Sequence, residues 1–465
     1  MWFMDSQPDM IGFNPTADSA KVRRSREPGL RGFVMHLGDI LRNGDAAFDR
    51  MFDRYGDVLW LRVPKFFEIF PGVSEVAFVR DPALIKPLFT APDEVIDSAT
   101  PNRVLGILHG DRSLLLMEGS EHRRLRRLLL SRLRGEALQQ WADVIVRSAE
   151  REARSWLAEE SVRVHHRMLN VSLEAILAIT LGISDETLPT WKAAWHELGE
   201  TWGSEEMAIR YALRRLGGVR RWRRFRRALA RCNELVFAEI ARRRATPNCG
   251  TADLLDLMLR ADGVPLSDNE IRDQIFTIML AGQETTAITV GWAIERLLRS
   301  PSAMKKATAE ARSTDATTYM EAVVHETLRL RPPITGLGRV TRQPITLGGY
   351  DFPANVLIAP LIRSIHRKPE LYDDPDRFMP ERFLDTPPGV YSLIPFGGGS
   401  HRCLGDRLAV FESTLILKTI LRTVELSAVD PRDEKVKRKA AVFVPGNGAL
   451  VRAQAIPHAS QLEDA

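Results

Sequence analysis

A ten-residue run near the C-terminus places one cysteine among four glycines: Phe396-Gly397-Gly398-Gly399-Ser400-His401-Arg402-Cys403-Leu404-Gly405. Glycine loses more backbone entropy on folding than any other residue, so this run is unfavourable in an ordinary packed core. It suits a backbone that turns tightly and presses against a flat, rigid object. A planar macrocycle whose iron takes one thiolate ligand is such an object, and thiolate ligation favours cleavage of the O–O bond. A buried cysteine beside a glycine loop is the alternative for a lone cysteine, but the full ten-residue pattern favours the iron ligand.

The residues that follow the cysteine predict a helix over about residues 404–421. Its apolar positions form one broad face, made of Leu408, Val410, Phe411, Leu415, Ile416 and Ile420. The sulfur would then lie near a helix N-terminus, where free N–H groups and the helix dipole stabilise an anion by about 0.3–1 kcal/mol. The sequence therefore predicts a setting that favours the thiolate.

A capping box, Ser267-Asp268-Asn269-Glu270, marks the start of a second and longer helix that stops before Pro301. Apolar residues occur nearly all round this helix, so it is expected to be buried. At 1.5 Å per residue, its ~32 residues would span about 48 Å, which is enough to cross the whole protein.

Midway along this helix lies a polar stretch, Ala281-Gly282-Gln283-Glu284-Thr285-Thr286. Polar side chains inside an apolar helix are costly unless they are satisfied, and threonine hydroxyls can bond backward to carbonyls and distort the helix. We expect a local widening here, with room for dioxygen and water and with Glu284 and Thr285 relaying protons. From this segment alone, a buried polar kink without chemistry is an equally good interpretation.

Two further segments carry charge at helical spacing. In Glu326-Thr327-Leu328-Arg329 an acid and a base lie three residues apart, a weak signal on its own. Pro380-Glu381-Arg382-Phe383 could bring a second guanidinium to Glu326. A buried cluster of this kind is structural, and removing one partner costs about 3–5 kcal/mol.

His122 and Arg126 are four residues apart and share a helical face, where they could bind a pair of carboxylates. Arg123, Arg124 and Arg127 would point elsewhere and could receive an acidic partner. A solvated basic helix is the alternative interpretation of this segment.

Together these motifs resemble the cytochrome P450 superfamily over nearly the whole chain. Segments 281–286, 326–329, 380–383 and 396–405 occur in the family's order and roughly its spacing, and the last is highly specific. The resemblance implies a mainly α fold with small β-sheets, in which a helical lobe adjoins a smaller β-rich lobe. Haem would lie between the long central helix and the helix after the cysteine. We expect residues 1–465 to form one such domain, with the first ~25 residues as a disordered N-terminal segment.

The same resemblance implies a role for each site residue. Cys403 would be the axial iron ligand of haem b (iron protoporphyrin IX). The other cofactor-binding residues would be His122, Arg126, Arg339, Phe396, Gly399, His401 and Gly405. Phe396 would pack on the thiolate side of the haem, the two glycines would allow close backbone approach, and the remaining four would contact the propionates.

The resemblance also assigns the oxygen-activating groove and a structural triad. Thr285 and Glu284 would form the acid–alcohol pair of the groove, beside Ala281 and Gly282, although many soluble relatives carry Asp where this chain has Glu284. The structural triad would consist of Glu326, Arg329 and Arg382. Arg402 and Asp406 are not the family's commonest residues at their positions, which bears on partner docking.

The implied activity is that of a haem-thiolate monooxygenase that inserts one oxygen atom of O2 into an apolar small molecule, by hydroxylation or epoxidation. Electrons would come from a ferredoxin or flavodoxin fed by an NAD(P)H-dependent reductase. A peroxide-driven oxygenase is an alternative, but it would not need the Glu284–Thr285 pair. A haem-binding protein without turnover would likewise leave that pair idle.

Composition limits the setting in which the protein works. The chain has 465 residues, of which 44% are hydrophobic, and three scattered cysteines, too few for a disulfide framework or a four-cysteine zinc site. A reducing cytoplasmic location and a monomeric state are expected. No stretch offers the ~20 apolar residues of a membrane span, so we expect a soluble protein.

Three further segments allow local predictions. Residues 58–63 and 66–73 are predicted to pair as a hairpin, and residues 92–113 to form a loop whose Val104, Leu105, Ile107 and Leu108 line a substrate pocket. Residues 210–231 carry ten arginines and no acidic residue. A solvated helix face is the plainest interpretation, and anionic lipid or an acidic carrier are alternatives; we do not expect nucleic-acid binding.

Overall fold

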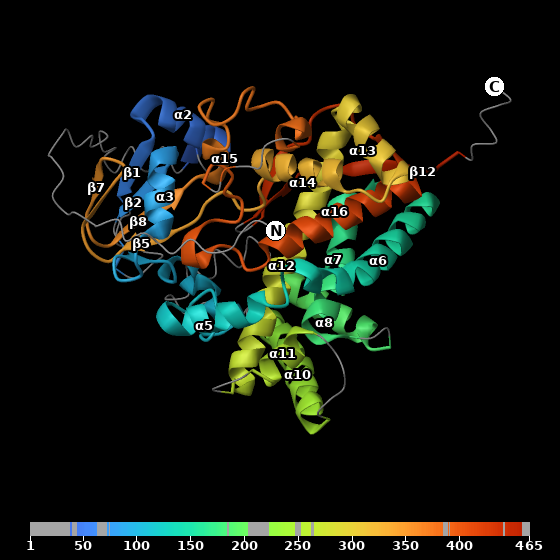
Figure 1. The fold of residues 1–465 in the computed structure, drawn as a ribbon, viewed down its shortest axis with the longest axis horizontal. Helices are drawn as coiled ribbons and strands as arrows, with labels where there is room; N and C mark the ends of the chain where they lie inside the picture. Colours follow the sequence, from blue (N-terminus) through green and yellow to red (C-terminus); the bar gives the residue numbers. More distant parts are fainter. Residues whose placement is uncertain are drawn as a thin grey trace.

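The computed structural model describes residues 38–39, 44–62, 72–73, 75–183, 186–202, 223–246, 253–261, 265–384, 389, 391–439 and 442–457. The described residues form a mainly helical protein with small separate sheets, which confirms the predicted fold class. Most helices gather on one side, and the largest sheet lies with α2 and α3 on the other (Figure 1). The predicted disordered N-terminal segment lies outside the described residues.

The described helical part is built from α-helices of very different lengths. They are α2 (Asp45–Tyr55), α3 (Pro82–Thr90), α4 (Gly106–His109), α5 (Gly119–Leu130), α6 (Ala142–Ser155), α7 (Val164–Leu181), α8 (Leu188–Trp202), α10 (Arg223–Ala245), α11 (Leu254–Leu259), α12 (Asp268–Leu298), α13 (Pro301–Ser313), α14 (Thr318–Leu330), α15 (Ile362–Ile365) and α16 (Asp406–Thr423). None of these described helices combines the length and the apolar composition that crossing a membrane requires.

The strands that the structure describes are short and belong to four sheets. They are β1 (Val58–Arg62), β2 (Glu75–Val79), β3 (Ile96–Asp97), β4 (Val162–Arg163), β5 (Arg339–Thr341), β6 (Ile345–Leu347), β7 (Tyr350–Phe352), β8 (Val356–Pro360), β9 (Val424–Ala428), β10 (Val436–Lys439), β11 (Val442–Pro445) and β12 (Leu450–Ala455). The largest sheet has the order β1-β2-β8-β5-β3, and the others are β10-β11, β4-β12-β9 and β6-β7.

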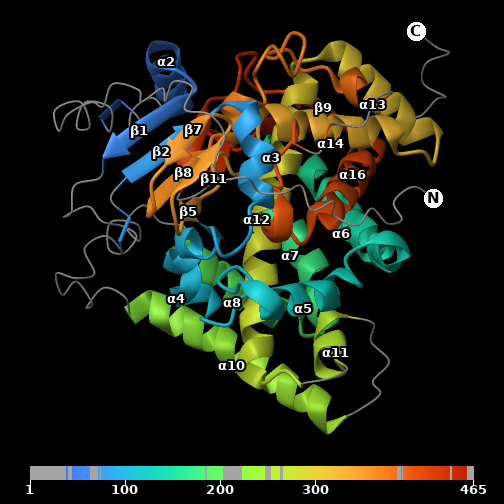
Figure 2. The same ribbon diagram turned by 60° about the vertical axis from the view of Figure 1, so that its left-hand side comes forward.

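The predicted long helix is α12, and it begins as the sequence indicates. The Ser267 hydroxyl accepts from the backbone N–H of Glu270, and the Glu270 carboxylate accepts from the N–H of Ser267 at 2.9 Å. Its 31 residues span about 46 Å and end three residues before Pro301. It packs against α7, α14 and α16 and runs through the centre of the molecule (Figure 2). This helix therefore serves as the axis on which the other elements are placed.

The predicted hairpin partner of β1 is wrong in its position. β1 pairs antiparallel with β2, from Val58 opposite Val79 to Arg62 opposite Glu75, so the partner strand starts after residues 66–73. Gly72 has a φ of 80°, which is incompatible with a strand and separates the two segments. Residues 63–71 lie outside the described part of the chain.

The predicted loop at residues 92–113 contains short helices, namely a 3-10 turn at Thr100–Leu105 followed by α4. Pro101 suits the first turn of such a helix because its missing N–H has no partner there. Leu108 is fully buried in the helical core, whereas Ile107 is 41% exposed. Ile107 is therefore accessible to a ligand and Leu108 is not; the Val104 side chain lies outside the described residues.

The arginine-rich segment is described only from residue 223 onward, where it begins α10. Phe225, Ala228 and Cys232 form the buried face of this helix, while Arg226 and Arg227 are exposed. The described part of the segment is thus an amphipathic helix with a solvated basic face.

Candidate functional site

The cysteine loop turns tightly between β8 and α16. Gly397 and Gly399 both have a φ of 67°, and the N–H of Cys403 donates to the carbonyl of Phe396 at 2.8 Å. A Cβ added at Gly399 would lie 1.8 Å from the backbone oxygen of Phe89 in α3, so only glycine fits there. Gly399 therefore permits close approach of the loop to α3, and its predicted approach to haem stays a prediction. At Gly405 an added Cβ would meet no atom within 4 Å, so open space lies beside it.

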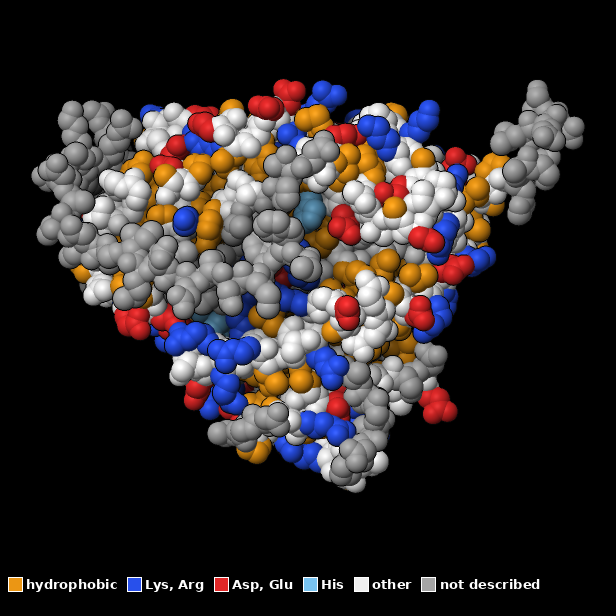
Figure 3. Space-filling view, viewed as in Figure 1, with side chains coloured by type: hydrophobic (Ala, Val, Ile, Leu, Met, Phe, Trp, Pro, Cys, Tyr) orange, Lys and Arg blue, Asp and Glu red, His pale blue; other side chains and the backbone are white. Residues whose placement is uncertain are grey.

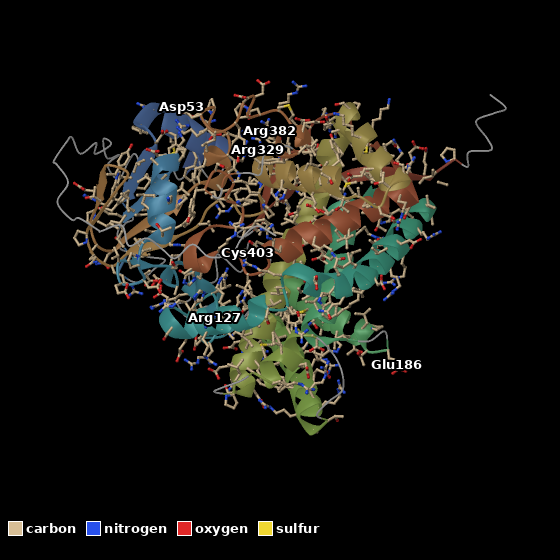
Figure 4. The ribbon with its side chains drawn as sticks, in the orientation of Figure 1. Asp53, Arg127, Glu186, Arg329, Arg382 and Cys403 are labelled. Atoms are coloured by element: carbon tan, nitrogen blue, oxygen red, sulfur yellow. The ribbon has the colours of Figure 1, made fainter. Side chains whose placement is uncertain are left out.

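Cys403 is exposed although protein surrounds it, a combination that is rare for a cysteine. The residue has accessible surface, yet it lies deep in the molecule at the N-terminal end of α16 (Figure 4). Burial raises the pKa of its thiol, while the N–H of Gly405, Arg126 and Arg402 act in the opposite direction. Cys403 is therefore exposed at the N-terminal end of α16, and an axial metal ligand must likewise be accessible to the metal.

The middle of α12 is also accessible, although the helix is buried on either side of it. Residues 271–278 and 286–297 are almost entirely buried, but Ala281 is exposed and residues 282–285 are partly exposed. The Thr285 hydroxyl donates to the carbonyl of Ala281 at 2.7 Å, as expected for a threonine within a helix. Since α12 packs on α16, this accessible turn and the accessible sulfur belong to adjoining elements.

Two details of this turn differ from expectation. Residues 268–298 form one unbroken α-helix, so the predicted widening is wrong. The backward hydrogen bond of Thr285 is made without interrupting the helix. Gly282 faces α7 instead of open space, because a Cβ there would lie 3.1 Å from the Ile176 side chain. Its glycine is explained by close packing of α12 on α7.

Four nitrogen-bearing side chains converge beside the cysteine loop. The rings of His122 and His401 stack with centroids 4.1 Å apart and planes 12° apart. Burial and then the neighbouring Arg126 lower the pKa of His122 to about 4. Burial and then His122, Arg339 and Arg126 lower the pKa of His401 to about 3. The two imidazoles are therefore neutral at pH 7 and lie among guanidinium groups.

These four side chains have no carboxylate partners among the described residues. The Nε2 of His401 is buried without a hydrogen-bond partner. Arg339 is 6% exposed, and its Nη1 donates only to the neighbouring carbonyl of Gly338 at 2.8 Å. Within the described part of the chain, none of the four residues forms an ion pair with a carboxylate. A buried charge is normally paired, so this set fits a ligand that supplies two carboxylates, as haem does through its propionates.

The predicted triad residues lie together behind the cysteine loop. Arg329 donates to both oxygens of Glu326 from Nε at 2.7 Å and Nη2 at 2.8 Å, and both side chains are fully buried. Arg382 reaches Glu326 with its Nε at 3.2 Å (Figure 4). Arg329 also donates to three backbone carbonyls, those of His366, Pro375 and Arg377. One side chain thus holds the segment that leads into residues 380–383.

Glu284 has partners that the sequence analysis did not identify. Its Oε1 accepts from the Nζ of Lys439 at 2.8 Å and lies 3.9 Å from the Nε2 of His165. A partly buried acid is stabilised by a cation, but 155 residues separate Glu284 from Lys439 and nothing local indicates the pairing. Lys439 stands in a strongly basic run, Lys435-Val436-Lys437-Arg438-Lys439, which is the one signal that the sequence offered.

A second acid, Glu412 in α16, is buried near Thr286 of α12 and forms no ion pair with any of the described residues. The residue is 2% exposed and its Oε1 has no hydrogen-bond partner. Burial raises the pKa of this carboxyl to about 8, although the nearby hydroxyls of Ser172 and Thr286 act against the shift. The group is therefore protonated at pH 7.

A basic surface covers α5. Arg123, Arg124 and Arg127 are exposed, and Figure 3 shows Lys and Arg side chains gathered where Figure 1 places this helix. Arg123 pairs with Asp93 at 3.1 Å. Next to the cysteine, the uncommon Arg402 pairs with the buried Asp406 at 2.7 Å, so these two residues compensate each other.

Comparison with known proteins agrees with this geometry. The family model described as Cytochrome P450 matches residues 33–451. The chain is 36% identical over 435 residues to "Putative cytochrome P450 137" of Mycobacterium tuberculosis, covering 91% of this chain and 90% of that protein. It is 34% identical over 443 residues to "Putative cytochrome P450 135B1" of Mycobacterium bovis, with 92% and 91% covered. The chain therefore belongs to the cytochrome P450 family of haem-dependent monooxygenases.

Proposed function

We propose that the protein inserts one oxygen atom of O2 into an apolar small molecule, by hydroxylation or epoxidation. The observation that carries this proposal is the pairing of an accessible, deeply placed sulfur at Cys403 with an accessible turn at Ala281 in an otherwise buried helix. A substrate bound in that space would meet the apolar Ala281 and the Thr285 hydroxyl. Apolar walls with few polar groups are typical of small-molecule sites.

The residues of the site divide into those that hold the haem and those that serve the reaction. Cys403 would hold the iron. His122, Arg126, Arg339 and His401 would bind the propionates through the donors that have no carboxylate partner. Bound haem supplies the activation of dioxygen, which the protein's own side chains cannot perform. Thr285 and Glu284 would deliver protons at the accessible turn, and the apolar surroundings would exclude bulk water.

Electrons would come from a ferredoxin or flavodoxin with an NAD(P)H-dependent reductase. The exposed arginines of α5, Arg124 and Arg127 among them, offer an acidic carrier a surface of complementary charge. This surface lies near the cysteine loop, because His122 on the buried face of α5 stacks on His401. We further propose a cytoplasmic monomer, in keeping with the few and scattered cysteines.

The ligand assignment is tested by reducing the purified holoprotein under carbon monoxide. The wild-type protein should give the red-shifted difference band of haem-thiolate proteins, and Cys403→Ser should abolish it. A band that survives the substitution would refute Cys403 as the ligand. Cys232→Ser is the matched control, since Cys232 is buried in α10 and should leave the band unchanged.

The reaction and the substrate class are tested in two steps. A panel of apolar compounds is first titrated into the ferric protein while the Soret band is followed. Compounds that shift the band are then incubated with NADPH and surrogate redox partners, or with hydrogen peroxide alone. Product that forms only with peroxide would favour the peroxide-driven alternative, and binding without product under either condition would refute the proposed reaction.

A further inference from the structure

The C-terminal hairpin β10–β11 lies directly against the part of α12 that carries Glu284. Trp292 donates from its Nε1 to the carbonyl of Phe443 at 3.1 Å. Ile288 and Trp292 are buried in one apolar cluster with Val444. The hairpin is therefore fixed to the helix by apolar packing and a hydrogen bond.

The spacing of these residues decides what the hairpin presents to the helix. Glu284, Ile288 and Trp292 are four residues apart in turn, so they share one face of α12. Lys439 is the last residue of β10 and pairs with Val442 across the hairpin. The apolar contact at Ile288 and Trp292 thus positions Lys439 opposite Glu284, where the distance between Nζ and Oε1 is 2.8 Å.

The surroundings of this ion pair extend from the interior to solvent. His165 lies on the inner side, with 3% of its side chain exposed and its Nε2 without a hydrogen-bond partner. Burial lowers the pKa of His165 to about 3, so the ring is neutral. Lys439 is 36% exposed, and the neighbouring His166 is also exposed. Within the described part of the chain, Glu284 therefore has one cation in contact, Lys439, and that side chain is partly exposed to solvent.

Resting on the proposed function, we propose that Lys439 is a positioning residue that orients the Glu284 carboxylate and places it at the solvent end of proton delivery to Thr285. Without Lys439, the groups that the described residues place near the carboxylate are the neutral His165, at 3.9 Å, and the exposed His166. The rotamers of Glu284 are then free, and its orientation relative to the adjacent Thr285 is lost. Arginine at 439 can restore the contact, because a guanidinium also donates to a carboxylate.

The contact itself is tested without any turnover. A water-soluble carbodiimide joins a carboxylate to an amine that touches it, and peptide mass spectrometry identifies the product. The wild-type holoprotein should yield a crosslink between the peptides of Glu284 and Lys439, and Lys439→Met should not. Lys437→Met is the matched control, because Lys437 is an exposed lysine on the same strand, and it should leave the crosslink in place. Absence of the crosslink from the wild-type protein would overturn the inference.

The positioning role is tested by NADPH oxidation with surrogate redox partners in H2O and in D2O. Lys439→Met should lower the rate at least threefold and increase the ratio of the rates in H2O and D2O, whereas Lys439→Arg should recover the rate to within twofold. An unchanged rate, or an equal loss in Lys437→Met, would overturn the proposal. A normal carbon monoxide band in all variants shows that each of them binds haem. If the wild-type protein lacks this band, the proposed function is refuted instead.

Discussion

The substitution Glu412→Gln tests whether the buried Glu412 carboxyl of α16 is protonated in the folded protein. Glutamine has nearly the shape of a protonated glutamic acid but cannot ionise. The folded protein holds the proton of Glu412 up to about pH 8, whereas the unfolded chain releases it near the ordinary value of 4.5. Between these values the unfolded state binds fewer protons, so wild-type stability falls as the pH rises.

The size of the effect follows from the two pKa values. One pKa unit corresponds to about 1.4 kcal/mol, so ionisation of Glu412 in the unfolded chain costs the wild type about 3 kcal/mol of stability at pH 7 and about 1 kcal/mol at pH 5. Glu412→Gln removes this dependence. The variant should therefore gain about 2 kcal/mol relative to the wild type between pH 5 and pH 7, whatever constant contribution the amide adds.

Urea denaturation of both holoproteins at pH 5, 6 and 7, followed by tryptophan fluorescence, measures this difference. Glu425→Gln is the control, because it removes an exposed carboxylate on β9, and its difference from the wild type should stay nearly constant. A stability difference between Glu412→Gln and the wild type that does not change with pH would refute a protonated Glu412. Infrared spectroscopy gives a second measure, since the variant should lose one protonated carboxyl band at pH 7.

Three further outcomes are expected. Thr285→Ala should keep haem and substrate binding but divert electrons from NADPH to peroxide; an unchanged product yield per NADPH would contradict the relay role. Gly399→Ala should lower the haem content of the purified protein, because its Cβ would overlap the Phe89 oxygen, whereas Gly199→Ala, in open space on α8, should not. Arg329→Lys should lower the free energy of unfolding by about 3 kcal/mol. Lysine keeps the charge but cannot donate to Glu326 and to the backbone carbonyls at the same time. An unchanged urea midpoint would contradict this expectation.

Local signals in the sequence predicted those parts of the fold that depend on neighbouring residues. The capping box at Ser267 and Glu270 gave the start of α12, and the four-residue spacing of His122 and Arg126 placed both on α5. Glu326 and Arg329 could be paired in advance because they lie three apart on one helix. In each case the decisive hydrogen bond or shared face forms within one or two helical turns.

The remaining features depend on contacts between distant segments, which no local pattern encodes. Gly399 was expected to face a macrocycle, but its requirement for glycine comes from the oxygen of Phe89, which belongs to a helix near the other end of the chain. Lys439 could not be distinguished from the other basic residues of its run until the packing of Trp292 placed the hairpin. The pairing of β1 with β2 was not predicted, because the alternating pattern of a strand does not indicate which later strand lies beside it.

The contact between Gly399 and Phe89 also bears on when the cofactor can be acquired during biosynthesis. β2 pairs in parallel with β8, and α3, which carries Phe89, directly follows β2, so the ligand loop is shaped by residues translated long before it. Contacts between such distant segments form slowly, because the intervening chain must be ordered first. We therefore expect haem to bind late in folding, after the ligand loop has docked on α3.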